Sequence, residues 1–147
     1  MRVLIQRCIE ASCMVDNKIT GQIPYGLVLF VGFTKGDSIT TIEYLVHKII
    51  NLRILDDENK VMNKSILDFP NPNVLSISQF TLYADTKKGN RPSYYKALNG
   101  MDASKLYELF NRELSKYVNV ATGIFGADMK INLINDGPIT ILLEKEN

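Results

Sequence analysis

Two short stretches of this 147-residue chain place polar side chains and turn-forming residues where chemistry could take place. Residues 78–82 read Ser-Gln-Phe-Thr-Leu and follow an apolar, strand-like run over 74–77. Residues 135–140 read Asn-Asp-Gly-Pro-Ile-Thr and lie near the C-terminus. The first stretch offers hydroxyl and amide groups beside a buried strand, and the second offers a Gly-Pro turn.

The first stretch has two interpretations. If the strand stays regular through Thr81, Gln79 and Thr81 share one face, and Ser78 and Phe80 share the other. The polar side chains could simply be hydrogen-bonded at a strand end. Alternatively, backbone N–H groups hold a developing oxyanion while the Thr81 hydroxyl orients an ester or a water. One such donor is worth about 10²–10³ in rate, but backbone donors leave no trace in the sequence.

The dipeptide Gly137-Pro138 also has more than one interpretation, because Gly-Pro most often marks an ordinary turn. Only about 5–6 % of X–Pro bonds in folded proteins are cis. Frequency alone therefore does not favour a cis bond here.

Conventional catalytic groups are scarce. A Ser-His-Asp triad requires a histidine that reaches the nucleophile. The single histidine, His47, lies off the apolar stripe of a predicted helix, four residues after Glu43, which favours an exposed helical pair. No nucleotide-binding loop or zinc-protease motif is present.

The two cysteines, Cys8 and Cys13, are too few for a disulfide framework. With only one histidine in the chain, a zinc site built from Cys and His is also not expected. On one continuous strand their odd spacing would place them on opposite faces, and we expect both to serve packing. The acidic residues 56–59 are better explained as a solvated turn than as a cation site. We therefore expect no metal and no cofactor.

The net charge of +1 does not by itself indicate a nucleic-acid-binding protein. Residues 87–91, Lys-Lys-Gly-Asn-Arg, could form a local RNA contact or simply a solvated loop. No apolar run approaches the roughly 20 residues of a membrane span, and the N-terminus lacks a secretory signal pattern. We expect a cytoplasmic protein with neither membrane nor DNA as a partner.

The pattern of elements predicts a single α+β domain over residues 1–147, with a largely antiparallel, barrel-like sheet and two main helices on one side. Apolar stripes predict helices after residue 38 and from Asp102, with Thr40 and Glu43 as a capping box for the first. Predicted strands cover residues 2–9, 11–16, 19–23, 27–33, 53–55, 74–78, 131–133 and 139–143.

Residues 78–82 and 135–140 resemble the two signature motifs of the D-aminoacyl-tRNA deacylases. Further similar segments occur in the same order, at residues 1–3, 51–53, 83–85, 91–93 and 125–129, together with Arg7 and the Ala11-Ser12 pair. The chain differs from many members by carrying Ile139 in place of valine, and by Cys8 and Cys13 where small apolar residues are common.

The resemblance implies a homodimer that hydrolyses the ester of D-aminoacyl-tRNA at two sites on the subunit interface. It implies that Gly137-Pro138 is a Gly-cis-Pro element that enters the partner's pocket. There it would clash with an L side chain and admit a D residue. Glycine has no side chain to clash, so glycine mischarged on alanine tRNA should also be accepted.

The resemblance also implies roles for individual residues. The Phe80 backbone N–H and the Thr81 hydroxyl would lie near the ester, with Ser78 and Gln79 shaping the pocket. The region that receives the adenosine and the amino acid would be lined by Phe125 and Met129. Arg7 would brace the Gly-Pro element, and the 2′-hydroxyl of the tRNA 3′ end would activate the water, which explains the missing histidine.

Two other functions remain open from the sequence. The chain could be a dimeric RNA-binding module without turnover, or a cytosolic esterase that acts on small esters without tRNA. Salt-sensitive tRNA binding without turnover would favour the first. Comparable activity on a D-amino-acid methyl ester and on charged tRNA would favour the second.

Overall fold

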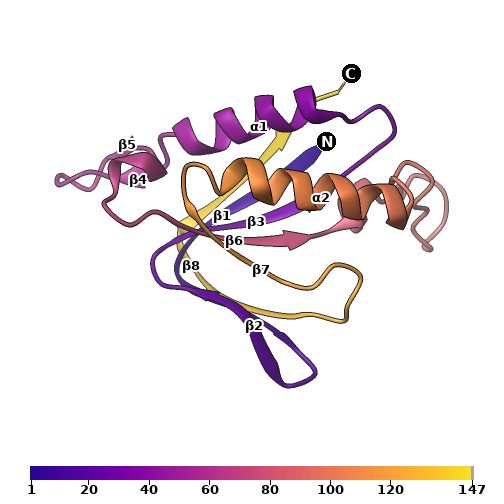
Figure 1. Ribbon diagram of the computed structural model, residues 1–147, viewed down its shortest axis with the longest axis horizontal. Coiled ribbons are helices and arrows are strands. Elements are labelled where there is room, and N and C mark those ends of the chain that lie inside the picture. The colour runs from indigo at the N-terminus through magenta and orange to yellow at the C-terminus, as the bar shows by residue number, and fades with distance from the viewer. Residues whose placement is uncertain (147) are drawn as a thin grey trace.

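A computed structural model describes residues 1–146, which fold around one six-stranded sheet (Figure 1). The strand order is β2-β1-β3-β6-β7, and β8 pairs with β1. The strands are β1 (Arg2–Val15), β2 (Lys18–Ile23), β3 (Gly26–Gly32), β6 (Asn73–Ser78), β7 (Asn119–Thr122) and β8 (Lys130–Glu144). Shorter elements are β4 (Leu55–Asp56), β5 (Met62–Lys64) and the 3₁₀ turns η1 (Ile66–Asp68) and η2 (Phe80–Tyr83).

The sheet is mixed and curls toward a barrel. β1 runs antiparallel to β2, β3 and β8, whereas β6 is parallel to both β3 and β7. The outer strands β2 and β7 approach each other so closely that a Cβ on Gly21 would lie 2.6 Å from the carbonyl oxygen of Thr122. The α+β, barrel-like prediction is therefore confirmed, and the two parallel pairs are an addition to it.

Two pairs of predicted strands are in fact single long strands. The segments predicted at 2–9 and 11–16 form the 14-residue β1, and those at 131–133 and 139–143 belong to the 15-residue β8. The pairing of β1 with β8 shifts register around Cys8 and Ala11. The turn chemistry predicted at Asp16 is confirmed, because Asp16 and Asn17 both have positive φ between β1 and β2.

Both helices, α1 (Ile39–Asn51) and α2 (Gly100–Leu114), cover the same face of the sheet (Figure 1). The predicted caps were wrong in detail. Ser38 caps α1, and its N–H donates to Thr41 Oγ1 at 3.3 Å. Asn99 caps α2 by accepting from the N–H of Asp102.

The interior has two apolar clusters. The larger lies between the helices and the sheet and includes Phe110, Tyr107 and the apolar stripe predicted for the first helix, Ile42, Leu45, Val46, Ile49 and Ile50. The smaller contains both cysteines together with Ala11, Val28 and Ile77. The prediction that Cys8 and Cys13 face opposite ways was wrong, because the irregular register between Cys8 and Ala11 changes the alternation of side chains. No helix in the described residues is long and apolar enough to cross a bilayer.

Candidate active site

A cavity of about 520 Å³ opens where β3 and β6 end, between η2, the start of α2 and the segment before β8. It is lined by Val31, Gly32, Phe33, Ile77, Ser78, Gln79, Phe80, Leu98, Gly100, Ala103, Phe125, Gly126, Ala127, Asp128, Met129 and Ile131. Five of the residues singled out in the sequence therefore meet in one cavity. They are Ser78, Gln79, Phe80, Phe125 and Met129.

The first motif does not continue as a strand. β6 ends at Ser78, the Gln79 N–H donates to the carbonyl of Val31 at 2.7 Å, and residues 80–83 turn into η2. The condition for the expected alternation, a regular strand through Thr81, is therefore not met. Instead, the Gln79 amide donates to the Thr81 hydroxyl. Thr81 is partly buried and is absent from the described residues that line the cavity.

This turn changes which backbone groups are available. The first N–H groups of any helix lack intrahelical acceptors. Among the described residues, the backbone hydrogen bonds leave the Phe80 N–H without an acceptor, whereas the Leu82 N–H donates to Gln79 at 3.3 Å. The Phe80 side chain is 57 % exposed at the rim. A free backbone donor thus lies at the cavity, which the residue types alone could not reveal.

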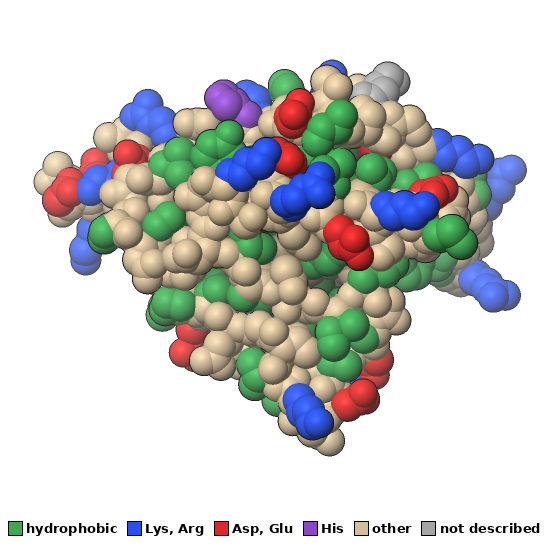
Figure 2. All heavy atoms as spheres, viewed as in Figure 1, with side chains coloured by type: hydrophobic (Ala, Val, Ile, Leu, Met, Phe, Trp, Pro, Cys, Tyr) green, Lys and Arg blue, Asp and Glu red, His purple; other side chains and the backbone are tan. Residues whose placement is uncertain are grey.

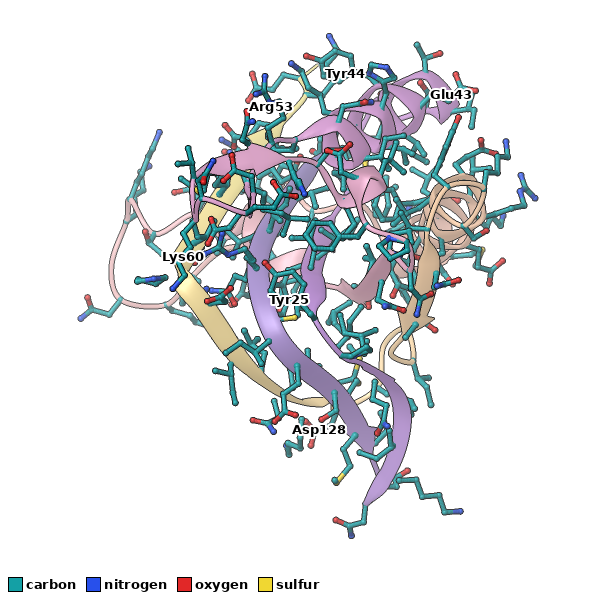
Figure 3. The ribbon with its side chains drawn as sticks, turned by 90° about the vertical axis from the view of Figure 1, so that its left-hand side faces the viewer. Tyr25, Glu43, Tyr44, Arg53, Lys60 and Asp128 are labelled. Atoms are coloured by element: carbon teal, nitrogen blue, oxygen red, sulfur yellow. The ribbon has the colours of Figure 1, made fainter. Side chains whose placement is uncertain are left out.

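The wall of the cavity opposite η2 is formed by residues 125–129, which lie close to the end of β7 at Gly123. A Cβ on Gly123 would lie 2.4 Å from Met129 Sδ and 3.2 Å from Cys13 Sγ. The absence of that Cβ lets the Met129 thioether pack onto the smaller apolar cluster. Phe125 packs against Tyr107 of α2, with ring centroids 5.9 Å apart. In Figure 3, Asp128 projects on the far side of the molecule from Tyr44 of α1.

Sequence reasoning missed the contribution of α2 and of β3. Gly100 and Ala103 leave space at the start of the helix, and Gly32 lets η2 approach, since its Cβ would lie 2.9 Å from the Gln79 carbonyl oxygen. The only sequence feature that could have indicated this contribution was the presence of small residues, Gly100 and Ala103, near the start of α2.

Gly137 and Pro138 do not line this cavity. Both are exposed in the middle of β8, and the peptide bond between them is cis. Asn135 holds the segment, because its side chain accepts from the Ile139 N–H at 2.8 Å and donates to the Ile139 carbonyl at 3.0 Å. The same amide donates to Thr140 Oγ1 at 3.2 Å.

Arg7 lies directly beneath this segment and is only 4 % exposed. Its Nε donates to the Asp136 carbonyl at 2.8 Å and lies 3.3 Å from the Asp136 carboxylate. Its Nη1 donates to Asp56 at 2.9 Å and to the Ile54 carbonyl at 3.0 Å. One buried guanidinium therefore ties β1 to β4 and to the residue before Gly137.

Among the described residues that line the cavity, Asp128 is the only ionisable one, and its exposed carboxylate is paired with Lys130 at 2.9 Å. Burial raises the pKa of the Cys8 thiol to about 11, and its Sγ–H donates weakly to the Gly26 carbonyl. Cys8 is therefore neutral near pH 7, and we expect its contribution to folding stability to fall as pH rises from about 9 to about 11. His47 is exposed on α1, as predicted. The described residues contain no cluster of three or more potential metal ligands.

Fold and cavity together define a small mixed-sheet protein whose described site residues are uncharged, apart from the exposed Asp128. A family model described as D-Tyr-tRNA(Tyr) deacylase matches residues 4–144. The chain therefore belongs to the D-Tyr-tRNA(Tyr) deacylase family, which makes it a deacylase hydrolase that acts on aminoacyl-tRNA.

Two solved structures have a similar fold. The chain is similar to a protein named c-Myc DNA Unwinding Element Binding Protein, with 34 % identity, a TM-score of 0.93 and 100 % of both chains covered. It is also similar in fold to a protein described as a probable eukaryotic D-amino acid tRNA deacylase, with 16 % identity, a TM-score of 0.84 and 97 % of both chains covered.

Proposed function

We propose that this protein is an editing enzyme that hydrolyses the ester of D-aminoacyl-tRNA to a free D-amino acid and tRNA, in the cytoplasm. The observation that carries the proposal is the free N–H of Phe80 at the cavity, in a chain of the deacylase family. The cavity volume suits an aminoacyl-adenosine end, because small-molecule sites typically occupy about 300–1,000 Å³.

The chemistry requires positioning more than a strong base, because an aminoacyl ester is already activated. The Phe80 N–H stabilises the oxyanion of the tetrahedral intermediate. The Thr81 hydroxyl, held by Gln79, orients this turn beside the ester. The 2′-hydroxyl of the terminal ribose activates the attacking water. Ser78, Phe125 and Met129 shape the space for the amino acid and the adenosine.

Selectivity for D residues comes from Gly137-Pro138 of a second protomer. Within one protomer this dipeptide is exposed and lies outside the cavity, so it can act on a cavity only across a dimer interface. Arg7 and Asn135 hold the segment in place by the hydrogen bonds described above. A rigid segment at the mouth excludes an L side chain and leaves room for a D side chain or for none.

The sheet face not covered by the helices supports the homodimer. Leu4 and Leu142 are directly paired between β1 and β8, and Leu142 is 46 % exposed. Ile134 on β8 is 48 % exposed and Ile9 on β1 is 52 % exposed. Exposed apolar residues gathered on two paired strands are typical of a protein–protein interface.

The decisive experiment compares initial rates on D-Tyr-tRNA and L-Tyr-tRNA charged on the same tRNA. We expect hydrolysis of the D form only. Glycine on alanine tRNA should be hydrolysed as well, because it lacks the side chain that the dipeptide would exclude. Equal rates on the D and L forms would reject the chiral filter, and a comparable rate on a D-tyrosine methyl ester would favour a general esterase.

A second candidate, nucleic-acid binding without turnover, is favoured by the 34 % identical relative, whose name describes a DNA-binding protein. Under this candidate the protein binds tRNA or DNA in a salt-dependent manner and leaves the ester intact. Turnover of D-Tyr-tRNA by a protein purified free of other hydrolases excludes it.

A further inference from the structure

The segment of residues 85–96 leaves η2 and projects from one end of the molecule (Figure 1). Every residue from 86 to 96 is exposed, but the base of the segment is anchored. Asp85 and Ser93 exchange backbone hydrogen bonds of 2.7 and 2.9 Å. The Thr34 hydroxyl donates to the Lys96 carbonyl at 2.6 Å. The segment is thus an exposed surface in a defined position, and Phe80, five residues before it, lines the cavity.

This segment exposes aromatic rings to water. Tyr95 is 66 % exposed and Tyr94 is 39 % exposed. Tyr94 packs edge-on against Phe80, with ring centroids 5.1 Å apart and an interplanar angle of 71°. Phe80 and Tyr94 thus form an aromatic pair at the cavity rim, and the next residue, Tyr95, exposes a further ring whose centroid lies 5.7 Å from Lys96 Nζ. Such rings are the usual platform for unpaired bases, since every base has a face that can stack.

The same segment concentrates positive charge. The whole chain has a net charge of +1, whereas residues 85–96 carry four basic residues and only one acidic residue, Asp85. The basic residues are Lys87, Lys88, Arg91 and Lys96. The rest of the chain is therefore net acidic. None of these four side chains forms an ion pair within the described part of the chain. Figure 2 shows basic side chains extending from the end of the molecule where this segment projects.

We propose that residues 85–96 bind the unpaired 3′ nucleotides of the tRNA that precede the terminal adenosine. Tyr95 stacks on one of these bases, while Lys87, Lys88 and Arg91 neutralise the phosphates. The inference rests on the proposed function, because an ester held in the cavity places the preceding nucleotides at its rim beside Phe80. The charge and the flat rings together favour single-stranded nucleic acid over an apolar protein segment.

The first test replaces the stacking ring. For Tyr95→Ala we expect KM for D-Tyr-tRNA to rise about 5- to 150-fold, the equivalent of one lost base stack, with kcat unchanged. On D-tyrosyl-adenosine, which lacks the preceding nucleotides, KM should stay at the wild-type value. Tyr44→Ala is the matched control, because Tyr44 is 46 % exposed on α1, does not line the cavity, and lies at the opposite end of Figure 3 from the lining residue Asp128.

The second test removes charge. For the double variant Lys87→Gln/Lys88→Gln we expect weaker binding of uncharged tRNA and a salt dependence less steep by about 1.4 in log Kd against log salt, since each single-stranded phosphate contact contributes about 0.7. The control Lys18→Gln/Lys60→Gln makes the same charge change at two exposed positions elsewhere, at the start of β2 and between β4 and β5. Its salt dependence should equal that of the wild type.

The outcomes separate this inference from the proposed function. Equal losses on D-Tyr-tRNA and D-tyrosyl-adenosine would overturn the inference and make Tyr95 part of the pocket. No loss on tRNA in either variant would overturn it as well. Equal competition by single-stranded DNA of the same sequence would replace tRNA-end recognition by general single-strand binding. A wild-type protein inactive on both esters would refute the proposed function, while the binding measurement would still test the segment.

Discussion

The Thr81 hydroxyl accepts a hydrogen bond from the Gln79 amide, and Thr81 is not among the described residues that line the cavity. We therefore expect Thr81→Ala to lower kcat on D-Tyr-tRNA by only about 2- to 12-fold, the effect of one net hydrogen bond. Thr81→Ser keeps the hydroxyl and should retain the wild-type rate. A loss of a hundredfold or more would mean that the hydroxyl takes part in the chemical step itself.

Arg7 is the residue whose loss should affect stability and selectivity together. Arg7→Met leaves the Asp56 and Asp136 carboxylates without their shared partner. Because those carboxylates are 36 % and 33 % exposed, we expect the free energy of unfolding to fall by about 2–3 kcal/mol in urea denaturation, below the value for a fully buried pair.

The same variant should raise the rate on L-Tyr-tRNA relative to D-Tyr-tRNA, because the segment before Gly137 loses its brace. Arg53→Met is the control, since Arg53 is exposed and its Nε donates to the Asn63 carbonyl, outside this network (Figure 3). Unchanged selectivity in Arg7→Met would restrict Arg7 to a stabilising role.

At the scale of elements, the parallel pairing of β3 with β6 positions the first motif, residues 78–82. Gly26 allows the two strands to approach each other at their start. A Cβ on Gly26 would lie 2.1 Å from the Asn73 carbonyl oxygen, a backbone atom that cannot move alone. We expect Gly26→Ala to lower the free energy of unfolding by more than about 3 kcal/mol. In the control Gly100→Ala nothing lies within 4 Å of the new Cβ, and stability should be unchanged or up to about 1 kcal/mol higher. A Gly26→Ala protein of wild-type stability would show that the strands can separate freely.

The sequence predicted these elements well wherever periodicity was strong. The α1 stripe and the apolar run in β3 were recognised from spacing and composition. The continuity of β1 and β8 was not, because an irregular register and an internal Gly-Pro look like chain breaks until the pairing between strands is known. The sequence did not indicate that Tyr107 is a core residue. Its hydroxyl can be buried because it donates to the Ser76 carbonyl at 2.7 Å, a contact between segments distant in sequence.

The site was predictable only in part, for a related reason. Polar residue types indicated that Ser78 and Gln79 could belong to a pocket, and the resemblance added Phe125 and Met129. The η2 turn, which frees the Phe80 N–H, depends on Gln79 bonding to β3, a contact between segments distant in sequence. Hydrogen bonds of that kind have no local pattern.

At the scale of the whole molecule, assembly should be necessary for activity. We expect the wild-type protein to sediment as a dimer and Leu142→Arg to sediment as a monomer without deacylase activity, because the charge would be buried against the partner. Leu142 is 46 % exposed in the protomer, so circular dichroism should show an unchanged fold. Met62→Arg, at a 52 % exposed position on β5, should remain dimeric and active. A fully active monomer would contradict the dimer-based filter.

The burial of both thiols has a practical consequence. Cys8 and Cys13 lie in the small cluster with Ile77 and Met129, behind the cavity wall, and the pKa of Cys8 is about 11. At pH 8 we expect iodoacetamide not to alkylate Cys8 or Cys13, because both thiols are buried. Acylation of the exposed His47 should not affect catalysis, because His47 is not part of the site. The enzyme should therefore keep its activity in the presence of reagents that inactivate hydrolases with a catalytic cysteine or histidine. An effective inhibitor will instead have to resemble the aminoacyl-adenosine in shape.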